Sequence, residues 1–363
     1  MNNSIKFAIA GAIIAAVIAS AIATTIPHAK PSSGVSDNNS TQPVSTPVQH
    51  KVLRIGYFPN INHAQAVIGL GNGDFQKMLG DSVEVKTQIF NAGPSAIEAI
   101  FAKQIDVTYV GPNPAINGYI KSNGESVRII SGAASGGAVF VVRNDSGIQT
   151  VKDFAGKKFA SPQLGNTQDV ALRKYLLDNG YQTADKGGNV TVIPATNADI
   201  VTLMLKKEID GAWVPEPWGA KLVHEANAHV FVDERTLWPN GDFVTAQIVA
   251  DPSYVQNNPD VIKKLLDANV NETVWINSHP AEAQQAFNDQ LVKLTGKAIP
   301  QDEFSDAFSR LKLTYDPIKS SLFKAADDAY QIGFFNSKPD LSNIYDLTIL
   351  NQVLAERGLP QIN

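Results

Sequence analysis

Cysteine is absent from this 363-residue sequence. Its absence excludes disulfide bonds, thiol chemistry, cysteine-based zinc sites and attachment of a bacterial lipid at a cysteine. Histidine is scarce as well: six are present, and no two have a spacing such as His-x-x-x-His that suits a shared metal ion. We therefore expect neither a metal site nor a cofactor.

Common catalytic motifs are also missing. The chain has no Gly-x-Ser-x-Gly nucleophile turn and no Gly-x4-Gly-Lys-Ser/Thr phosphate loop, and its carboxylates are scattered rather than paired. This pattern favours a protein that is not an enzyme. A net charge of −5 excludes a broad basic surface for nucleic acid, which requires clustered lysine and arginine.

The N-terminal segment is the one long apolar run in the sequence. Residues 7–26 carry no charge and follow Lys6, and their length is close to the roughly 20 residues that span a bilayer. We predict that residues 1–26 are a signal peptide or an uncleaved membrane anchor, which places the remainder outside the cytoplasm. Residues 27–50 are rich in Ser, Thr, Pro and Asn without an aromatic residue, and are predicted to form a disordered linker.

From Lys51 onward, short apolar segments alternate with amphipathic ones, a pattern typical of α/β proteins with parallel sheets. The predicted strands are residues 52–57, 83–90, 107–110, 128–131, 139–143, 158–160, 190–194, 211–214, 230–232 and 244–250. After Asp251 the pattern is helical almost to the end.

The chain also repeats itself. Residues 89–114 and 193–218 align without a gap, and both read as a strand, a capped helix, Ile-Asp, a second strand and a Pro-x-Pro turn. Any α/β fold repeats strand, helix and strand, but the shared turn chemistry favours two similar lobes. Ligands of open α/β sheets lie beyond the carboxyl ends of the strands. This rule places loops around one cleft: 58–65, 111–115, 132–137, 163–168 and 215–218.

The segment from Ser161 to Asp169 is the most informative of these loops. A short strand enters a glycine-containing turn, and Asn166 or Thr167 caps the helix that follows, with Asp169 in its first turn. The unpaired N–H groups and positive end of a helix dipole can hold a small anion without a metal. An ordinary capped helix after a strand is the alternative interpretation.

Other loops supply further candidates. Glycines in residues 132–137 free backbone N–H groups to point inward, unless the segment is merely a flexible connection. Glu216 stands between two prolines and near Trp213 and Trp218, where it would suit a ligand that carries an amine as well as an anion. Equally, Pro-Glu-Pro-Trp would cap a helix and the tryptophans would belong to the core. The predicted ligand-binding residues are Asn60, His63, Gly111, Asn113, Ser135, Gly136, Gly165, Asn166, Thr167, Gln168, Glu216 and Trp218.

Four segments together resemble a known family. Residues 161–173, 131–137, 111–114 and 216–220 are similar to the substrate-binding proteins of nitrate/sulfonate/taurine ABC importers, and most similar to the aliphatic-sulfonate branch. The resemblance covers about residues 51–330. It implies a type-2 periplasmic-binding fold, in which two α/β lobes are joined by a two-strand hinge with the ligand cleft between them. The hinge strands would lie near 141–143 and 243–246, so that lobe 1 is 51–142 plus 243–363 and lobe 2 is 143–242.

The resemblance also implies a function. The protein would be a monomeric, extracytoplasmic solute-binding protein, secreted or tethered by its N-terminal segment. It would deliver a small oxyanion-bearing solute to the permease and ATPase subunits of an ABC importer. An aliphatic sulfonate or taurine is favoured, with nitrate or bicarbonate as alternatives. The anion would be held by N–H groups of residues 165–168 and by the side chains of Asn166, Thr167 and Ser135.

Two other functions stay open. The same fold would bind a pyrimidine precursor of thiamine or a similar heterocycle, stacked on Tyr57, Tyr109, Trp213 or Trp218. The thiamine-precursor enzymes of this fold depend on a cysteine-rich motif, which this chain lacks. A function of another class is a secreted enzyme that uses Glu216 or Asp169 with His63.

Overall fold

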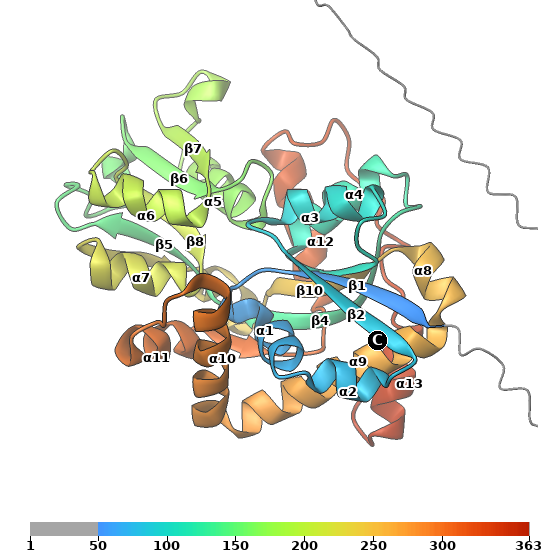
Figure 1. The fold of residues 1–363 in the computed structure, drawn as a ribbon. Coiled ribbons are helices and arrows are strands. Elements are labelled where there is room, and N and C mark those ends of the chain that lie inside the picture. The colour runs from blue at the N-terminus through green and yellow to red at the C-terminus, as the bar shows by residue number, and fades with distance from the viewer. Residues whose placement is uncertain (1–49, 363) are drawn as a thin grey trace, which may run out of the picture. The chain divides into compact units, whose positions relative to one another are not determined.

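Two β-sheets flanked by helices make up residues 50–362, which are the residues that the computed structural model describes (Figure 1). The predicted signal peptide or anchor and the predicted linker up to residue 49 lie outside the described residues. Within the described range, no helix is both long enough and apolar enough to cross a membrane.

The first sheet of the described chain has six strands in the order β11-β4-β10-β3-β1-β2. Strand β1 pairs in parallel with β2 and β3, whereas β10 runs antiparallel to β3 and β4. The sheet is therefore mixed rather than purely parallel. Its strands are β1 (Lys51–Tyr57), β2 (Val83–Ile89), β3 (Val107–Val110), β4 (Arg128–Gly136), β10 (Val244–Ala250) and β11 (Leu311–Leu313).

The second sheet has five strands in the order β7-β6-β8-β5-β9 within residues 50–362. Strand β6 pairs in parallel with β7 and β8, and β5 runs antiparallel to β8 and β9. This order corresponds to β2-β1-β3-β10-β4 in the first sheet. Strand β7 is then equivalent to β2, β6 to β1, β8 to β3, β5 to β10 and β9 to β4. Its strands are β5 (Ala138–Arg143), β6 (Lys158–Pro162), β7 (Thr191–Ala195), β8 (Gly211–Pro215) and β9 (Ala228–Asp233).

The sequence repeat occupies equivalent positions in the two sheets. Residues 89–114 run from the end of β2 to the start of α4, and residues 193–218 run from β7 to the start of α7. The chain passes from the first sheet to the second between β4 and β5, and it returns between β9 and β10. The predicted lobe boundaries at 142 and 243 stay a prediction.

Helices cover both faces of the first sheet (Figure 1). One face carries α1 (Ala64–Gly71), α2 (Asp74–Leu79), α9 (Pro259–Ser278), α10 (Pro280–Thr295) and α13 (Thr348–Glu356). The other face carries α3 (Gly93–Phe101), α4 (Pro112–Lys121) and α12 (Lys319–Gln331). The short helix α8 (Pro252–Asn257) follows β10, and α11 (Gln301–Ser309) precedes β11.

The second sheet is covered by α5 (Thr167–Asp178) on one face and by α6 (Asn197–Leu205) and α7 (Trp218–Glu225) on the other. The short 3-10 turns are η1 (Ile61–His63), η2 (Val151–Phe154), η3 (Ala184–Lys186), η4 (Glu234–Leu237) and η5 (Pro239–Gly241). Beneath α5, Trp213 is fully buried and stacks on Phe140 with ring centroids 5.3 Å apart. Trp213 therefore belongs to the core.

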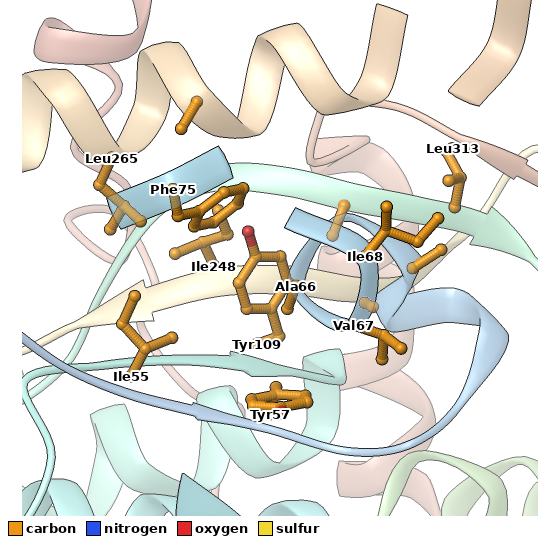
Figure 2. Packing of buried hydrophobic residues seen from close by; sticks show 14 of the residues in the cluster. Ile55, Tyr57, Ala66, Val67, Ile68, Phe75, Tyr109, Ile248, Leu265 and Leu313 are labelled. Atoms are coloured by element: carbon orange, nitrogen blue, oxygen red, sulfur yellow. The ribbon is translucent and has the colours of Figure 1, made fainter. Parts of the chain in front are cut away.

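The largest core lies between the first sheet and α1, α2 and α9. Figure 2 shows Tyr109 at its centre, with Phe75 and Ile248 packed nearby. The Tyr109 hydroxyl donates to Asn269 Oδ1 at 2.9 Å, so this buried polar group is satisfied. Full burial of each large apolar side chain stabilises the fold by about 1.5–3 kcal/mol.

One predicted loop is a strand. Residues 132–136 are buried and continue β4 between β10 and β11, so the prediction of a glycine loop over 132–137 is wrong. Small residues are required here by close packing, because a Cβ on Gly132 would lie 2.2 Å from the backbone oxygen of Asp316.

Candidate functional site

A small polar cavity of about 20 Å³ lies where the two sheets face each other. Its lining follows the carboxyl ends of strands from both sheets, in agreement with the rule for open α/β folds. The lining residues are Phe58, Asn60, Asn62, His63, Asn91, Ala92, Gly111, Asn166, Thr167, Gln168, Asn197, Pro215 and Thr245. We call this space the polar cavity.

Helix N-termini surround the polar cavity. Ala92, Gly111 and Asn166 are the N-cap residues of α3, α4 and α5, and Asn197 is the first residue of α6. Ala92 and Gly111 have no polar side chain, and the Asn166 side chain makes no cap hydrogen bond to the backbone of α5. The described residues that line the cavity include no lysine, arginine, aspartate or glutamate. The local field is therefore set by positive helix ends and neutral hydrogen-bonding groups, a combination that favours an anion.

His63 contributes a neutral donor. Burial lowers its pKa to about 3, so the ring is uncharged at physiological pH. Its Nδ1 accepts a hydrogen bond from the Phe58 N–H at 3.3 Å, and its ring stacks on Phe58 with centroids 4.5 Å apart. Because Nδ1 is the acceptor, the ring proton lies on Nε2, which is left as a hydrogen-bond donor.

Hydrogen bonds to Asp169 stabilise the turn before α5. Its buried carboxylate accepts from Ser161 Oγ at 2.8 Å, from the Gly165 N–H at 2.9 Å and from Arg173 Nε at 3.0 Å. These bonds fix the backbone of the turn and leave Asp169 outside the cavity lining. Asp169 is thus engaged in structure, which does not fit the role of a catalytic acid beside His63.

Several side-chain groups in the cavity are buried without a partner. Thr167 Oγ1, Asn62 Oδ1 and Asn197 Oδ1 have no hydrogen-bond partner within residues 50–362. An unpaired buried polar atom costs about 1–3 kcal/mol. The cavity is therefore better suited to a polar guest than to remaining dry.

Six of the twelve predicted site residues line the polar cavity: Asn60, His63, Gly111, Asn166, Thr167 and Gln168. The other six do not. Asn113 turns away and donates to the Ala325 carbonyl at 3.2 Å, Gly165 belongs to the turn before α5, and Gly136 ends β4. Ser135 Oγ accepts from the Phe243 N–H at 3.2 Å, because residue 135 lies in a strand rather than in a loop.

Glu216 forms a buried ion pair outside the polar cavity. Its Oε1 lies 2.7 Å from Arg310 Nη1, and its Oε2 accepts from the Ala220 N–H at 2.9 Å in the first turn of α7. Burial raises the pKa of Glu216, and both of these partners oppose the rise. Glu216 therefore behaves as the helix-capping group of the alternative interpretation and does not face the cleft.

Trp218 forms part of the wall beside the polar cavity. Its Nε1 donates to Asn60 Oδ1 at 3.0 Å, and the Ile61 N–H donates to the Glu216 carbonyl at 3.2 Å. A weaker side-chain bond of 3.4 Å joins Ser95 to Gln163. These bonds connect elements of the two sheets beside the polar cavity.

Sequence reasoning missed part of the lining. Asn91 directly follows the predicted strand 83–90, and Asn197 lies three residues after the predicted strand 190–194, so the carboxyl-end rule applied to β2 and β7 would have found both. Asn62 lies in η1, inside a loop that was predicted to border the cleft. Thr245 lies within β10, where a search of loops cannot reach it.

Comparisons with known proteins support the fold. The chain is 23% identical over 313 residues to an aliphatic sulfonates-binding protein of Bacillus subtilis (strain 168), covering 85% of this chain and 90% of that protein. It is similar in structure to the alkanesulfonate-binding protein SsuA from Xanthomonas axonopodis pv. citri bound to MOPS, with a TM-score of 0.68, 16% identity and coverage of 81% and 98%. The periplasmic nitrate-binding protein NrtA from Synechocystis PCC 6803 gives a TM-score of 0.68, 15% identity and coverage of 85% and 90%.

These matches confirm the periplasmic-binding fold that the sequence motifs implied. In the described range, no group of three or more His, Cys, Asp or Glu side chains is arranged to hold a metal ion. The model of the NMT1-like family matches residues 46–289, which is more than half of the sequence. The chain belongs to the NMT1-like family.

Proposed function

We propose that the protein is an extracytoplasmic solute-binding protein of an ABC importer. It binds a small oxyanion-bearing solute, an aliphatic sulfonate or taurine in the first place, and delivers it unchanged to a permease with its ATPase. The observation that carries this proposal is the polar cavity itself, which combines several helix N-termini with neutral donors and has no charged side chain among its described lining residues.

The donors of the cavity match the needs of an oxyanion. Asn60 and Gln168 each use their side-chain oxygen within the protein, accepting from Trp218 Nε1 and from Asn166 Nδ2, which leaves both NH2 groups free to donate. Thr167 adds a hydroxyl, and His63 adds its Nε2–H. Each hydrogen bond to a charged group is worth about 1.5–3 kcal/mol.

The alternatives receive less support. Of the aromatic residues suggested to stack on a heterocycle, Tyr109 and Trp213 are fully buried in the cores, and neither Tyr57 nor Trp218 lines the polar cavity. For an enzyme, Glu216 and Asp169 are both paired with arginines outside the cavity lining. We therefore favour a binding protein over an enzyme.

The relatives also support the proposed transport role. The Bacillus subtilis relative is named for aliphatic sulfonates, and the two structural neighbours are named for alkanesulfonate and nitrate. We propose that the two sheets belong to lobes, residues 51–142 plus 243–363 and residues 143–242, which close on the solute. Closure would remove water from the anion and present the permease with a loaded surface.

Isothermal titration calorimetry with ethanesulfonate, taurine, nitrate and bicarbonate tests the proposal. Thr167→Ala is expected to weaken binding about 10- to 100-fold, because one hydrogen bond to the anion is lost. Thr202→Ala is the matched control, since Thr202 is exposed on α6 and outside the cavity. The oxyanion proposal fails if none of the four solutes gives a binding isotherm.

A further inference from the structure

Three residues meet where the chain passes from the first sheet to the second. The Gly137 N–H donates to the Arg310 carbonyl at 2.8 Å, and the Gly137 carbonyl accepts from the Glu216 N–H at 2.9 Å. Arg310 Nη1 donates to Glu216 Oε1 at 2.7 Å, so that each of the three residues bonds the other two. We call Gly137, Glu216 and Arg310 the junction.

The junction joins elements of both sheets. Gly137 lies between β4 and β5, Glu216 follows β8 of the second sheet, and Arg310 lies between α11 and β11 of the first sheet. Helices α7 and α11, which flank Glu216 and Arg310, lie side by side (Figure 1). The close approach requires glycine at position 137, because its φ is +76° and a Cβ there would lie 2.9 Å from Leu311 Cβ.

Glu216 also connects the junction to the polar cavity. Its neighbour Pro215 lines the cavity, and its own carbonyl accepts from the Ile61 N–H at 3.2 Å. Ile61 lies between Asn60 and Asn62, which both line the cavity. Two parts of the lining, one after β8 of the second sheet and one after β1 of the first, therefore depend on where Glu216 is held.

The bonding of Glu216 leaves it little freedom to move. Its Oε1, Oε2, N–H and carbonyl each bond a different residue: Arg310, Ala220, Gly137 and Ile61. The Glu216 side chain is fully buried and that of Arg310 is 12% exposed, so water has little access to the pair. Arg310 Nη2 also donates to Asp306 Oδ1 at 2.6 Å, and its planar fork thus spans two carboxylates.

We propose that the Glu216–Arg310 ion pair positions the two walls of the polar cavity and thereby sets how long a bound anion is retained. This inference rests on the proposed function. Neither residue is among the described residues that line the cavity, so both act through the backbone that they hold. Breaking the pair leaves the anion donors on each wall but lets the walls move apart. Bound solute should then leave faster while its capture is unchanged.

Stopped-flow tryptophan fluorescence and calorimetry on the full-length protein test the pair. The probe is whichever of ethanesulfonate, taurine, nitrate and bicarbonate binds the wild type most tightly. Arg310→Lys keeps the charge but cannot span Glu216 and Asp306 together, and Glu216→Gln keeps the shape but removes the charge. Each variant is expected to raise the dissociation rate about 3- to 30-fold and to leave the association rate within about twofold of the wild type.

The ion pair between Arg54 and Asp106 supplies matched controls. Asp106 is a buried carboxylate that accepts from Arg54 Nε at 2.9 Å, but both residues belong to the first sheet and its connections, and neither lines the cavity. Arg54→Lys and Asp106→Asn should lower the melting temperature, as the junction variants do, and leave both rate constants unchanged.

The outcomes separate the inference from the proposed function. Junction variants that capture and release the probe at wild-type rates overturn the inference and leave the proposed function intact. Faster release from the control variants as well overturns it too, because the effect would then be general damage. If none of the four solutes binds the wild type, the proposed function fails and the inference fails with it.

Discussion

Gly111 offers the sharpest test of how the polar cavity is assembled. It is the N-cap of α4, which packs on the first sheet, and it faces Thr167 at the start of α5, which packs on the second sheet. A Cβ at position 111 would lie 2.3 Å from Thr167 Oγ1, whereas ordinary contacts begin near 3.5 Å. The backbone angles of Gly111, φ −71° and ψ 167°, are allowed for alanine, so Gly111→Ala should fold normally.

The expected cost of Gly111→Ala in binding follows from that contact. Either the two walls separate or Thr167 leaves its rotamer, which costs about 0.5–1.5 kcal/mol, and the hydroxyl no longer meets the anion, which costs about 1.5–3 kcal/mol. The sum of about 2–4.5 kcal/mol corresponds to a roughly 30- to 2,000-fold loss of affinity. Calorimetry with ethanesulfonate measures the loss, and circular dichroism verifies the fold.

A double-mutant cycle separates this mechanism from general damage. In Gly111→Ala/Thr167→Ala the clashing oxygen is gone, and the next neighbours of the new Cβ are Thr167 Cβ at 3.3 Å and the Thr245 carbonyl at 3.4 Å. The double variant should therefore bind about as well as Thr167→Ala alone. Additive losses, or a Gly111→Ala variant that binds within twofold of the wild type, would refute the reasoning.

Three further predictions concern buried charges. Arg310→Ala leaves Glu216 buried without its cation, so thermal unfolding should show a loss of about 3–5 kcal/mol, and an unchanged melting temperature would contradict the ion pair. Burial raises the pKa of Glu234 from 4.5 to about 7 while Trp213 Nε1 donates to it at 2.6 Å. Between about pH 4.5 and 7, Glu234 is then protonated in the folded state and ionised in the unfolded state, so its contribution to the free energy of unfolding falls as pH rises through this range. The stability of Glu234→Gln, measured by urea unfolding, should therefore increase relative to that of the wild type from about pH 5 to pH 8. Because the pKa of His63 is lowered to about 3, anion affinity should be flat between pH 5.5 and 8 in calorimetry, and a tenfold rise on acidification would show that His63 becomes charged.

Most strands could be predicted from the sequence because their apolar residues are bounded by turns. Strand β10 has the predicted bounds, and β1 and β3 differ by one residue at most. The end of β4 could not be predicted, because its Gly, Ala and Ser residues lack the branched and aromatic side chains that mark strands. The small size of Gly132 is explained by the loop at Asp316 and that of Gly136 by the backbone at Arg310, and both lie far away in the sequence.

The site was predictable to the extent that it follows a local rule. The α5 start and the Asn60 loop follow strand ends, and both line the polar cavity. Glu216 also follows a strand, but its partner Arg310 is 94 residues away in the sequence and holds it outside the cavity. Local patterns therefore indicate where a ligand site forms, whereas long-range partners decide which side chains reach it.

The central claim is that neutral donors and helix N-termini select a negative charge. Calorimetric comparison of ethanesulfonate with ethanesulfonamide tests it directly, since the two molecules have nearly the same shape and only the sulfonate is charged. We predict that the sulfonate binds at least 100-fold more tightly, because each donor of the cavity bonds an ionised oxygen more strongly than a neutral one. Equal or tighter binding of the sulfonamide would contradict the account.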